Sequence, residues 1–175
     1  LVLRRQRQMC IRDRNNVKQK VNTLKNINAG LDAQRKSLVL LENNGILPLK
    51  KETKIYIDGL DKNIGKDFGN VVNDPSKADV IIMYIHTVFN GNQESGLNRI
   101  FDNFLSTFFP NGDLEFNEEI KNKIKKYSKH KELIVVVDLN RPAILETIKE
   151  SSSGVIATFG VLDQIIFEGI YGKFN

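Results

Sequence analysis

The stretch ELIVVVDL (Glu132–Leu139) gives the clearest indication of the fold. It is short, rich in valine, and apolar without alternation. Continuous apolar runs of this kind are typical of strands covered on both faces of a parallel sheet. DVIIMYIH (Asp79–His86) and GVIATFG (Gly154–Gly160) have the same character, and KIYIDGL (Lys54–Leu60) is a further short run rich in Ile and Tyr. We expect all four runs to be buried strands.

Stretches with a helical period lie between and around these runs. Apolar residues recur on one face from Val21 to Leu41, and Asn44 and Gly45 supply a stop, so this whole segment is expected to be a helix. The stretch NEEIKNKIKKYSKHK starts at Asn117 with acids in its first turn and ends in lysines, which suits the helix dipole. In RPAILETIKES, Pro142 suits a first helical turn, and VLDQIIFEGIYGKF reads as a last amphipathic helix.

Strands that alternate with helices indicate βαβ units. They predict a three-layer α/β sandwich with a mostly parallel, doubly wound sheet of the flavodoxin or Rossmann type, containing about five core strands with right-handed crossovers. No apolar stretch approaches the length of a membrane span, so no membrane partner is expected.

The first residues differ in character from the rest. RRQRQMCIRDR (Arg4–Arg14) holds five arginines, one aspartate and the only cysteine. Back-translated in one frame, Arg4 to Asp13 resembles a transposase adapter used in sequencing libraries. We therefore expect residues 1–14 to be a disordered, non-native scar, excluded from fold reasoning. A basic arm that binds nucleic acid is the alternative, whereas a targeting peptide is excluded because no apolar run follows.

Setting residues 1–14 aside changes the bulk properties. Five arginines against one aspartate account for +4 of the formal net charge of +5, which leaves residues 15–175 at about +1. Nucleic-acid binding needs clustered Lys and Arg, so no nucleic-acid partner is expected. Without Cys10, disulfides and cysteine-ligated metals are excluded. Residues 15–175 suffice for one domain with a real core, and the sequence assigns them to neither the cytoplasm nor a secreted compartment.

A possible phosphate loop fails on its spacing. GLDKNIGKD follows a strand, but five residues separate Gly59 from Gly65 where the motif needs four. Asp67 stands where Ser or Thr would hold magnesium, and its charge would repel phosphate. We expect a solvated turn and no nucleotide cofactor.

The two histidines have different settings. His130 sits in a lysine-rich helix end, where a histidine suits the dipole. His86 ends a strand at the expected carboxyl edge of the sheet, where doubly wound folds place ligands. Neither has a second ligand at metal spacing, so no metal site is predicted. His86 is a candidate for lining a site.

A long connection follows His86. The segment from Thr87 to Phe116 runs between a strand and a helix, and connections of such length are usually functional. It carries Glu94 and Arg99 among several phenylalanines. A carboxyl group near apolar rings tends to have a raised pKa, as a general acid requires. The alternative is an exposed glutamate in a lid packed by phenylalanines.

Several segments together resemble a known family. RKSLVLLENNGILPLKK, from Arg35, resembles the segment that opens the C-terminal domain of glycoside hydrolase family 3, where a helix precedes an L-P-L turn. ADVIIMYI (from Ala78), VVVDLNRPAIL (from Val135) and GVIATFGVLDQIIFEGIYGKFN (from Gly154) resemble its second strand, its R-P stretch and its final strand and helix. These pieces occur in the family's order across residues 18–175. The chain stops before the P-S-G-K-L-P stretch that members usually carry, and we expect a fragment truncated at both ends.

The resemblance implies an activity. In this family an N-terminal (β/α)₈ barrel supplies an aspartate nucleophile, and in many members the C-terminal domain supplies a glutamate acid/base from a long loop. ESGLNR resembles an E-x(3–4)-R pattern found in that loop, which makes Glu94 the candidate acid/base, with Glu115 as the alternative. His86 and Arg99 become candidates for substrate binding. The implied parent is a retaining, exo-acting β-glucosidase-type hydrolase with a carbohydrate substrate and no cofactor, of which this fragment alone is inactive.

Two other functions stay open. In the β-N-acetylglucosaminidases of the same family the acid/base is a histidine–aspartate pair on the barrel, so that this domain would be structural. The second alternative is a free-standing flavodoxin-like binding module. Such a module would have no exposed apolar face.

Overall fold

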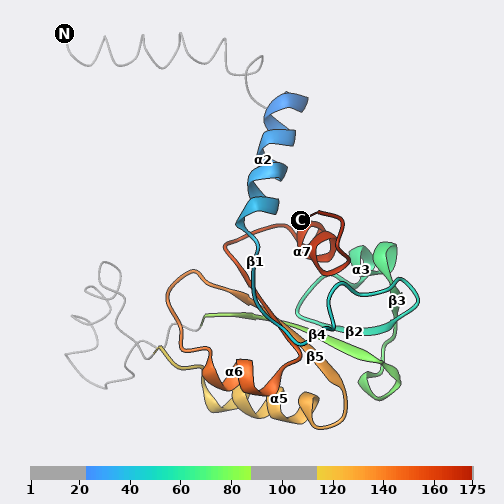
Figure 1. The fold of residues 1–175 in the computed structure, drawn as a ribbon, viewed down its shortest axis with the longest axis vertical. Coiled ribbons are helices and arrows are strands. Elements are labelled where there is room, and N and C mark those ends of the chain that lie inside the picture. The colour runs from blue at the N-terminus through green and yellow to red at the C-terminus, as the bar shows by residue number, and fades with distance from the viewer. Residues whose placement is uncertain (1–22, 88–113, 175) are drawn as a thin grey trace, which may run out of the picture. The chain divides into compact units, whose positions relative to one another are not determined.

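The computed structural model describes residues 23–87 and 114–174. It divides into two units, Leu1–Lys36 and Ser37–Asn175. The first contains nearly all of helix α2 (Leu24–Ser37), where the Oγ1 of Thr23 accepts a hydrogen bond from the backbone N–H of Asn26 at 3.2 Å. The second contains the sheet and all other described helices (Figure 1). The predicted scar at residues 1–14 lies outside the described residues and stays a prediction.

The second unit is built on a six-stranded sheet in the order β1-β6-β5-β4-β2-β3. The pairs β2–β3, β2–β4, β4–β5 and β5–β6 are parallel, and only β1 is antiparallel to its neighbour among the described pairs. The strands are β1 (Val39–Asn43), β2 (Lys54–Asp58), β3 (Asn70–Val71), β4 (Val80–His86), β5 (Glu132–Asp138) and β6 (Gly154–Thr158).

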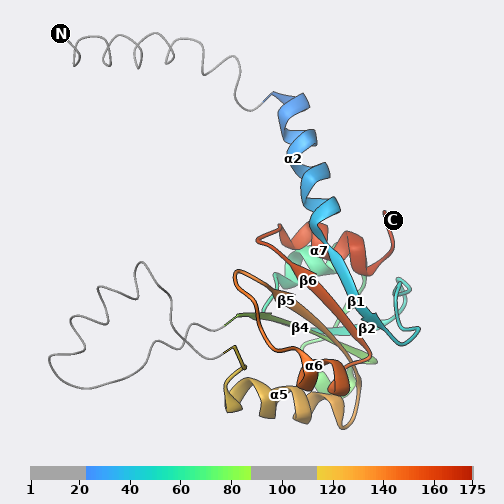
Figure 2. The ribbon, with the colours of Figure 1, turned by 60° about the vertical axis from the view of Figure 1, so that its left-hand side comes forward.

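Helices cover both faces of this sheet, as Figures 1 and 2 show. Helices α3 (Lys62–Phe68) and α7 (Asp163–Ile170) share one apolar cluster with the sheet, and α5 (Glu118–Ser128) and α6 (Glu146–Ser151) share the other. A short 3₁₀ turn, η1 (Pro75–Lys77), leads into β4. The predicted three-layer α/β sandwich with a mostly parallel sheet is confirmed.

The central strands send alternate side chains to opposite faces. Ile134 and Val136 of β5 join the α3/α7 cluster, whereas Val135 and Val137 join the α5/α6 cluster. All four are fully buried. A strand covered on both faces needs apolar residues at every position, which explains the unbroken run that the sequence shows.

The expected helix from Val21 to Leu41 is wrong in its last residues, 38–41. Helix α2 ends at Ser37, and the following residues form β1, which pairs with β6 from Val39↔Ala157 to Asn43↔Gly154. Without β1, β6 would be an unpaired edge of the sheet, and covering such an edge outweighs a local helical pattern. The sheet therefore has six strands where about five were predicted.

Two further local predictions are corrected. The expected solvated turn at GLDKNIGKD is helix α3, whose N-cap Asp61 accepts a hydrogen bond from the N–H of Asn63 at 2.7 Å. A Cβ on the buried Gly65 would lie 2.3 Å from Cδ1 of Ile57, so this glycine lets α3 approach β2 closely. Pro142 lies in the connection before α6, which begins only at Glu146.

The helix predicted from Asn117 is confirmed as α5, and the Oδ1 of Asn117 accepts the N–H of Ile120 at 2.9 Å. The last amphipathic helix is confirmed as α7. Within the described ranges, no helix is long and apolar enough to cross a membrane.

Candidate functional site at the carboxyl edge of the sheet

The parallel strands bring their last residues to one edge. His86, Asp138 and Thr158 end β4, β5 and β6, and they stand beside one another in the register of the sheet. Strands β4 and β5 are neighbours, as are β5 and β6. The topology therefore places Asp138 between the other two at the edge where doubly wound folds bind ligands.

Asp138 is the buried centre of this group. Only 4% of the residue is exposed. Its Oδ1 accepts hydrogen bonds from the backbone N–H of Gly160 at 2.9 Å and from the hydroxyl of Thr158 at 3.4 Å. Its Oδ2 accepts one from Nδ2 of Asn140 at 3.0 Å and faces Nδ1 of His86 at 3.1 Å. One carboxylate thus connects the ends of three strands.

His86 is held at one nitrogen and open at the other side of its ring. Its side chain is 64% exposed, although Nδ1 contacts the almost fully buried Asp138 carboxylate. The ring of Tyr84 packs edge-on against the imidazole, with centroids 4.8 Å apart and planes at 84°. These two contacts fix both the position and the tilt of the ring.

Tyr84 supports the group from beneath. Burial raises the pKa of its hydroxyl, and the negative charge of Asp138 raises it further, so the phenol stays neutral. Behind Tyr84 lies Gly59, whose φ is +94°. A Cβ at this position would lie only 2.7 Å from the carbonyl oxygen of Tyr84, which is too close. A side chain at Gly59 would therefore displace the end of β4, which carries His86.

The two ends of the long connection after β4 are attached to the end of β5 and to the segment that follows it. The N–H and hydroxyl of Thr87 donate to the carbonyl oxygen of Asp138 at 3.1 and 3.3 Å. The carbonyl oxygen of Leu114 accepts the N–H of Ile144 at 2.9 Å. The connection therefore leaves and returns at the carboxyl edge. Its candidate residues Glu94 and Arg99 lie outside the described residues.

Two other predicted residues have different settings. Glu115 forms an ion pair with Lys121 of α5 at 2.6 Å, and this contact raises the pKa of the lysine. His130 follows α5 and precedes the start of β5, at the opposite edge of the sheet from His86. The part of the chain that the structure describes holds no group of three His, Cys, Asp or Glu residues suited to a metal ion.

The sequence analysis identified His86 and missed its partners. Asp138, Asn140 and Thr158 bear no motif of their own. One signal was available, because ELIVVVDLN places a carboxylate and an amide directly after an unbroken apolar strand. A polar residue ending a buried parallel strand points to the carboxyl edge, and pairing β4 with β5 then brings Asp138 opposite His86.

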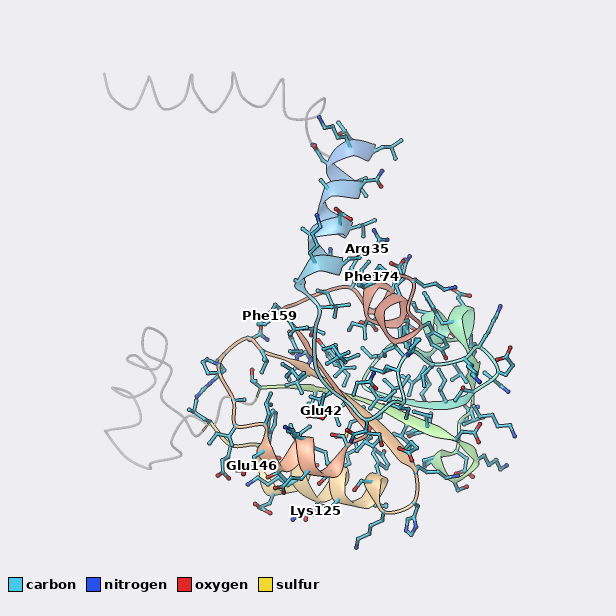
Figure 3. All side chains as sticks on the ribbon, viewed as in Figure 1. Arg35, Glu42, Lys125, Glu146, Phe159 and Phe174 are labelled. Carbon is cyan, nitrogen blue, oxygen red and sulfur yellow. The ribbon has the colours of Figure 1, made fainter. Side chains whose placement is uncertain are left out.

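Exposed apolar side chains surround this edge. They occur on the segments that enter or leave it: Leu114 before α5, Ile144 before α6, and Phe159 and Leu162 after β6, with exposures of 44 to 55%. Figure 3 shows Phe159 beyond the end of β6. Large apolar side chains grouped at one edge are typical of surfaces that another protein part covers.

Comparison with known proteins gives the family. No protein-family model matches the chain. A periplasmic beta-glucosidase/beta-xylosidase of Dickeya chrysanthemi is 32% identical over 138 residues, which are 77% of this chain and 20% of that protein. Beta-glucosidase C of Emericella nidulans is 30% identical over 155 residues, which are 83% of this chain and 23% of that protein. The chain belongs to glycoside hydrolase family 3.

Solved structures of this family share the fold. Beta-glucosidase 3B of Thermotoga neapolitana superposes with a TM-score of 0.67 at 13% identity, over 87% of this chain and 30% of that one. The beta-glucosidase of Listeria innocua gives 0.67 at 16% identity, over 91% and 27%. The family 3 resemblance stated from the sequence is confirmed. The chain spans about a fifth of the length of the curated relatives it matches.

Proposed function

We propose that this chain is the C-terminal α/β domain of a retaining, exo-acting glycoside hydrolase of the β-glucosidase type, which hydrolyses O-glycosyl bonds together with an N-terminal (β/α)₈ barrel. The names of the Dickeya and Emericella relatives support the activity. The short part of each relative that the chain matches supports a second domain.

One structural observation carries the proposal. The long connection after β4 leaves at Thr87 and returns at Leu114, and its two ends are hydrogen-bonded to the end of β5 and to the segment that follows it. Exposed apolar side chains stand around the same edge. An active-site loop that reaches into a second domain needs a fixed base and an apolar surface for that domain to cover, and this edge offers both.

In the proposed reaction Glu94 is the acid/base. It protonates the glycosidic oxygen as the barrel's aspartate attacks the anomeric carbon, and the aglycone leaves while a covalent glycosyl-enzyme forms. Glu94, now a carboxylate, then takes a proton from water, whose oxygen attacks the same carbon and releases the sugar with retained configuration. The described residues hold the base of the loop, and His86 and Arg99 are proposed to contact the substrate.

The rival readings find less support. A free-standing binding module predicts no exposed apolar face, and the described carboxyl edge has four such side chains. The two curated relatives described above are named beta-glucosidases, which favours that activity over an N-acetylglucosaminidase.

The test compares residues 15–175 with the enzyme that contains them, using an aryl β-glucoside. We expect the enzyme to hydrolyse it and the highly purified fragment to show no turnover above buffer, because the fragment lacks the nucleophile. An enzyme without glycosidase activity would refute the proposed activity. Turnover by the fragment would refute the two-domain mechanism.

A further inference from the structure

The Asp138–His86 pair has a feature that the proposed acid/base chemistry does not use. Oδ1 of Asp138 receives the backbone N–H of Gly160, and Oδ2 receives the amide of Asn140. A backbone N–H can only donate, and a carboxylate can only accept. The hydroxyl of Thr158 also donates to Oδ1. Because the carboxylate has no hydrogen to give, its contact with His86 requires a donor on the histidine as well. Nδ1 of His86 must therefore carry a hydrogen.

This assignment determines the other ring nitrogen. A neutral imidazole carries one hydrogen, so a hydrogen on Nδ1 leaves Nε2 as an acceptor. Within the described residues, the polar contact of His86 is made through Nδ1, and the side chain is 64% exposed. The edge-on contact with Tyr84 restricts the tilt of the ring, and the contact with Asp138 favours the orientation that places Nδ1 inward. The sheet edge thus presents one oriented acceptor to whatever binds there.

We propose that Asp138 is a positioning residue, which holds His86 in the Nδ1–H tautomer so that Nε2 accepts a hydrogen bond from a hydroxyl group of a pyranoside. The choice of a sugar hydroxyl rests on the proposed function. The tautomer itself rests only on the contacts of Asp138. The arrangement resembles the way in which second groups orient a functional histidine elsewhere in proteins.

The first experiment reads the tautomer directly in this chain. Histidine labelled with ¹⁵N is incorporated, and two-bond ¹H–¹⁵N correlations are recorded at a pH where both imidazoles are neutral. We expect His86 to show a protonated Nδ1 and a bare Nε2. His130 lies at the opposite edge of the sheet, away from Asp138, and it serves as the comparison within the same spectrum.

The variant Asp138→Asn should reverse the tautomer of His86. The N–H of Gly160 requires an acceptor, so the amide oxygen of the new side chain takes the Oδ1 position. Its NH₂ group then occupies the Oδ2 position and donates to Nδ1 of His86, while the exposed Asn140 can turn its own amide oxygen inward. We expect the His86 tautomer to reverse and that of His130 to stay unchanged. An Nε2–H tautomer in the parent chain, or no reversal in a folded Asp138→Asn variant, would overturn the positioning role.

The second experiment tests the sugar contact in the enzyme that contains this chain. His86→Asn keeps an NH₂ group near the Nδ1 position and removes everything at Nε2. Loss of one neutral hydrogen bond should raise KM about five- to tenfold with kcat little changed. His86→Gln places an amide near Nε2 and should restore part of the loss, and His130→Asn should have no effect.

The outcomes separate the two proposals. An unchanged KM for His86→Asn overturns the sugar contact even if the tautomer is as expected. An enzyme with no glycosidase activity overturns the proposed function and the sugar contact with it. In that case the spectrum still decides whether Asp138 positions His86, because it needs no substrate.

Discussion

The two edges of the sheet are built from similar residues and use them differently. At the amino edge Asp79 accepts the N–H of Lys54 at 3.0 Å, and the hydroxyl of Ser153 bonds to the carboxylate of Glu132. Each contact joins the first residue of one strand to the residue that precedes the neighbouring strand. At the carboxyl edge Asp138 gathers donors from three strand ends, and a histidine there keeps one nitrogen open. The first edge stabilises the fold, and the second presents groups outward.

A second carboxylate at the carboxyl edge sharpens this contrast. Asp58 ends β2 and forms an ion pair with Lys123 at 2.7 Å, and its Oδ2 also accepts the hydroxyl of Tyr127 at 3.1 Å. Burial and the charge of Asp58 together raise the pKa of Tyr127. Asp58 therefore contacts a lysine and a neutral phenol. Asp138 forms its ion pair, among the residues that the structure describes, with a histidine, which is cationic only when protonated.

The largest expected effect tests whether the carboxyl edge carries the chemistry. In the enzyme that contains this chain, Glu94→Gln keeps the side-chain shape and removes the proton donor. Substrates with poor leaving groups should slow by about 10²–10⁴-fold, because general acid catalysis contributes that much. Substrates with very acidic leaving groups should keep their first step, and added azide should speed the second. Steady-state rates with both substrate types check this.

Glu115→Gln is the matched control for that experiment. Glu115 is held by Lys121 on the α5 side, and its loss should leave both rates nearly unchanged. If Glu94→Gln has little effect and Glu115→Gln a large one, the acid/base assignment is wrong and the alternative is right.

The next effect compares the two carboxylates by stability. Asp138→Ala removes the acceptor for the N–H of Gly160 and should lower the free energy of unfolding by about 1–3 kcal/mol, the cost of leaving such a group unsatisfied. Asp58→Ala removes a partly exposed ion pair and should cost less, about 1 kcal/mol. Urea denaturation of residues 15–175 measures both. Equal losses would show that burial does not distinguish the two sites.

The sequence predicted the layers of this fold because the apolar runs in β4, β5 and β6 admit few other arrangements. It misplaced β1, since Leu38 and Leu41 also fit a helical stripe and only the open side of β6 selects a strand. It found His86 by position on the sheet. It missed Asp138 because that role depends on register, which places residues 52 positions apart in contact.

The smallest expected effect lies at the amino edge. His130→Asn and Asp79→Asn change exposed residues, and Asp79→Asn keeps an oxygen able to accept the N–H of Lys54. Exposed substitutions of this kind usually alter the free energy of unfolding by no more than about 0.5 kcal/mol. The kcat and KM of the enzyme should stay at parent values, since no group here faces the proposed substrate. A rise in KM for His130→Asn equal to that for His86→Asn would mean that the two edges do not differ in function, because both histidines would then act on the substrate only through the fold.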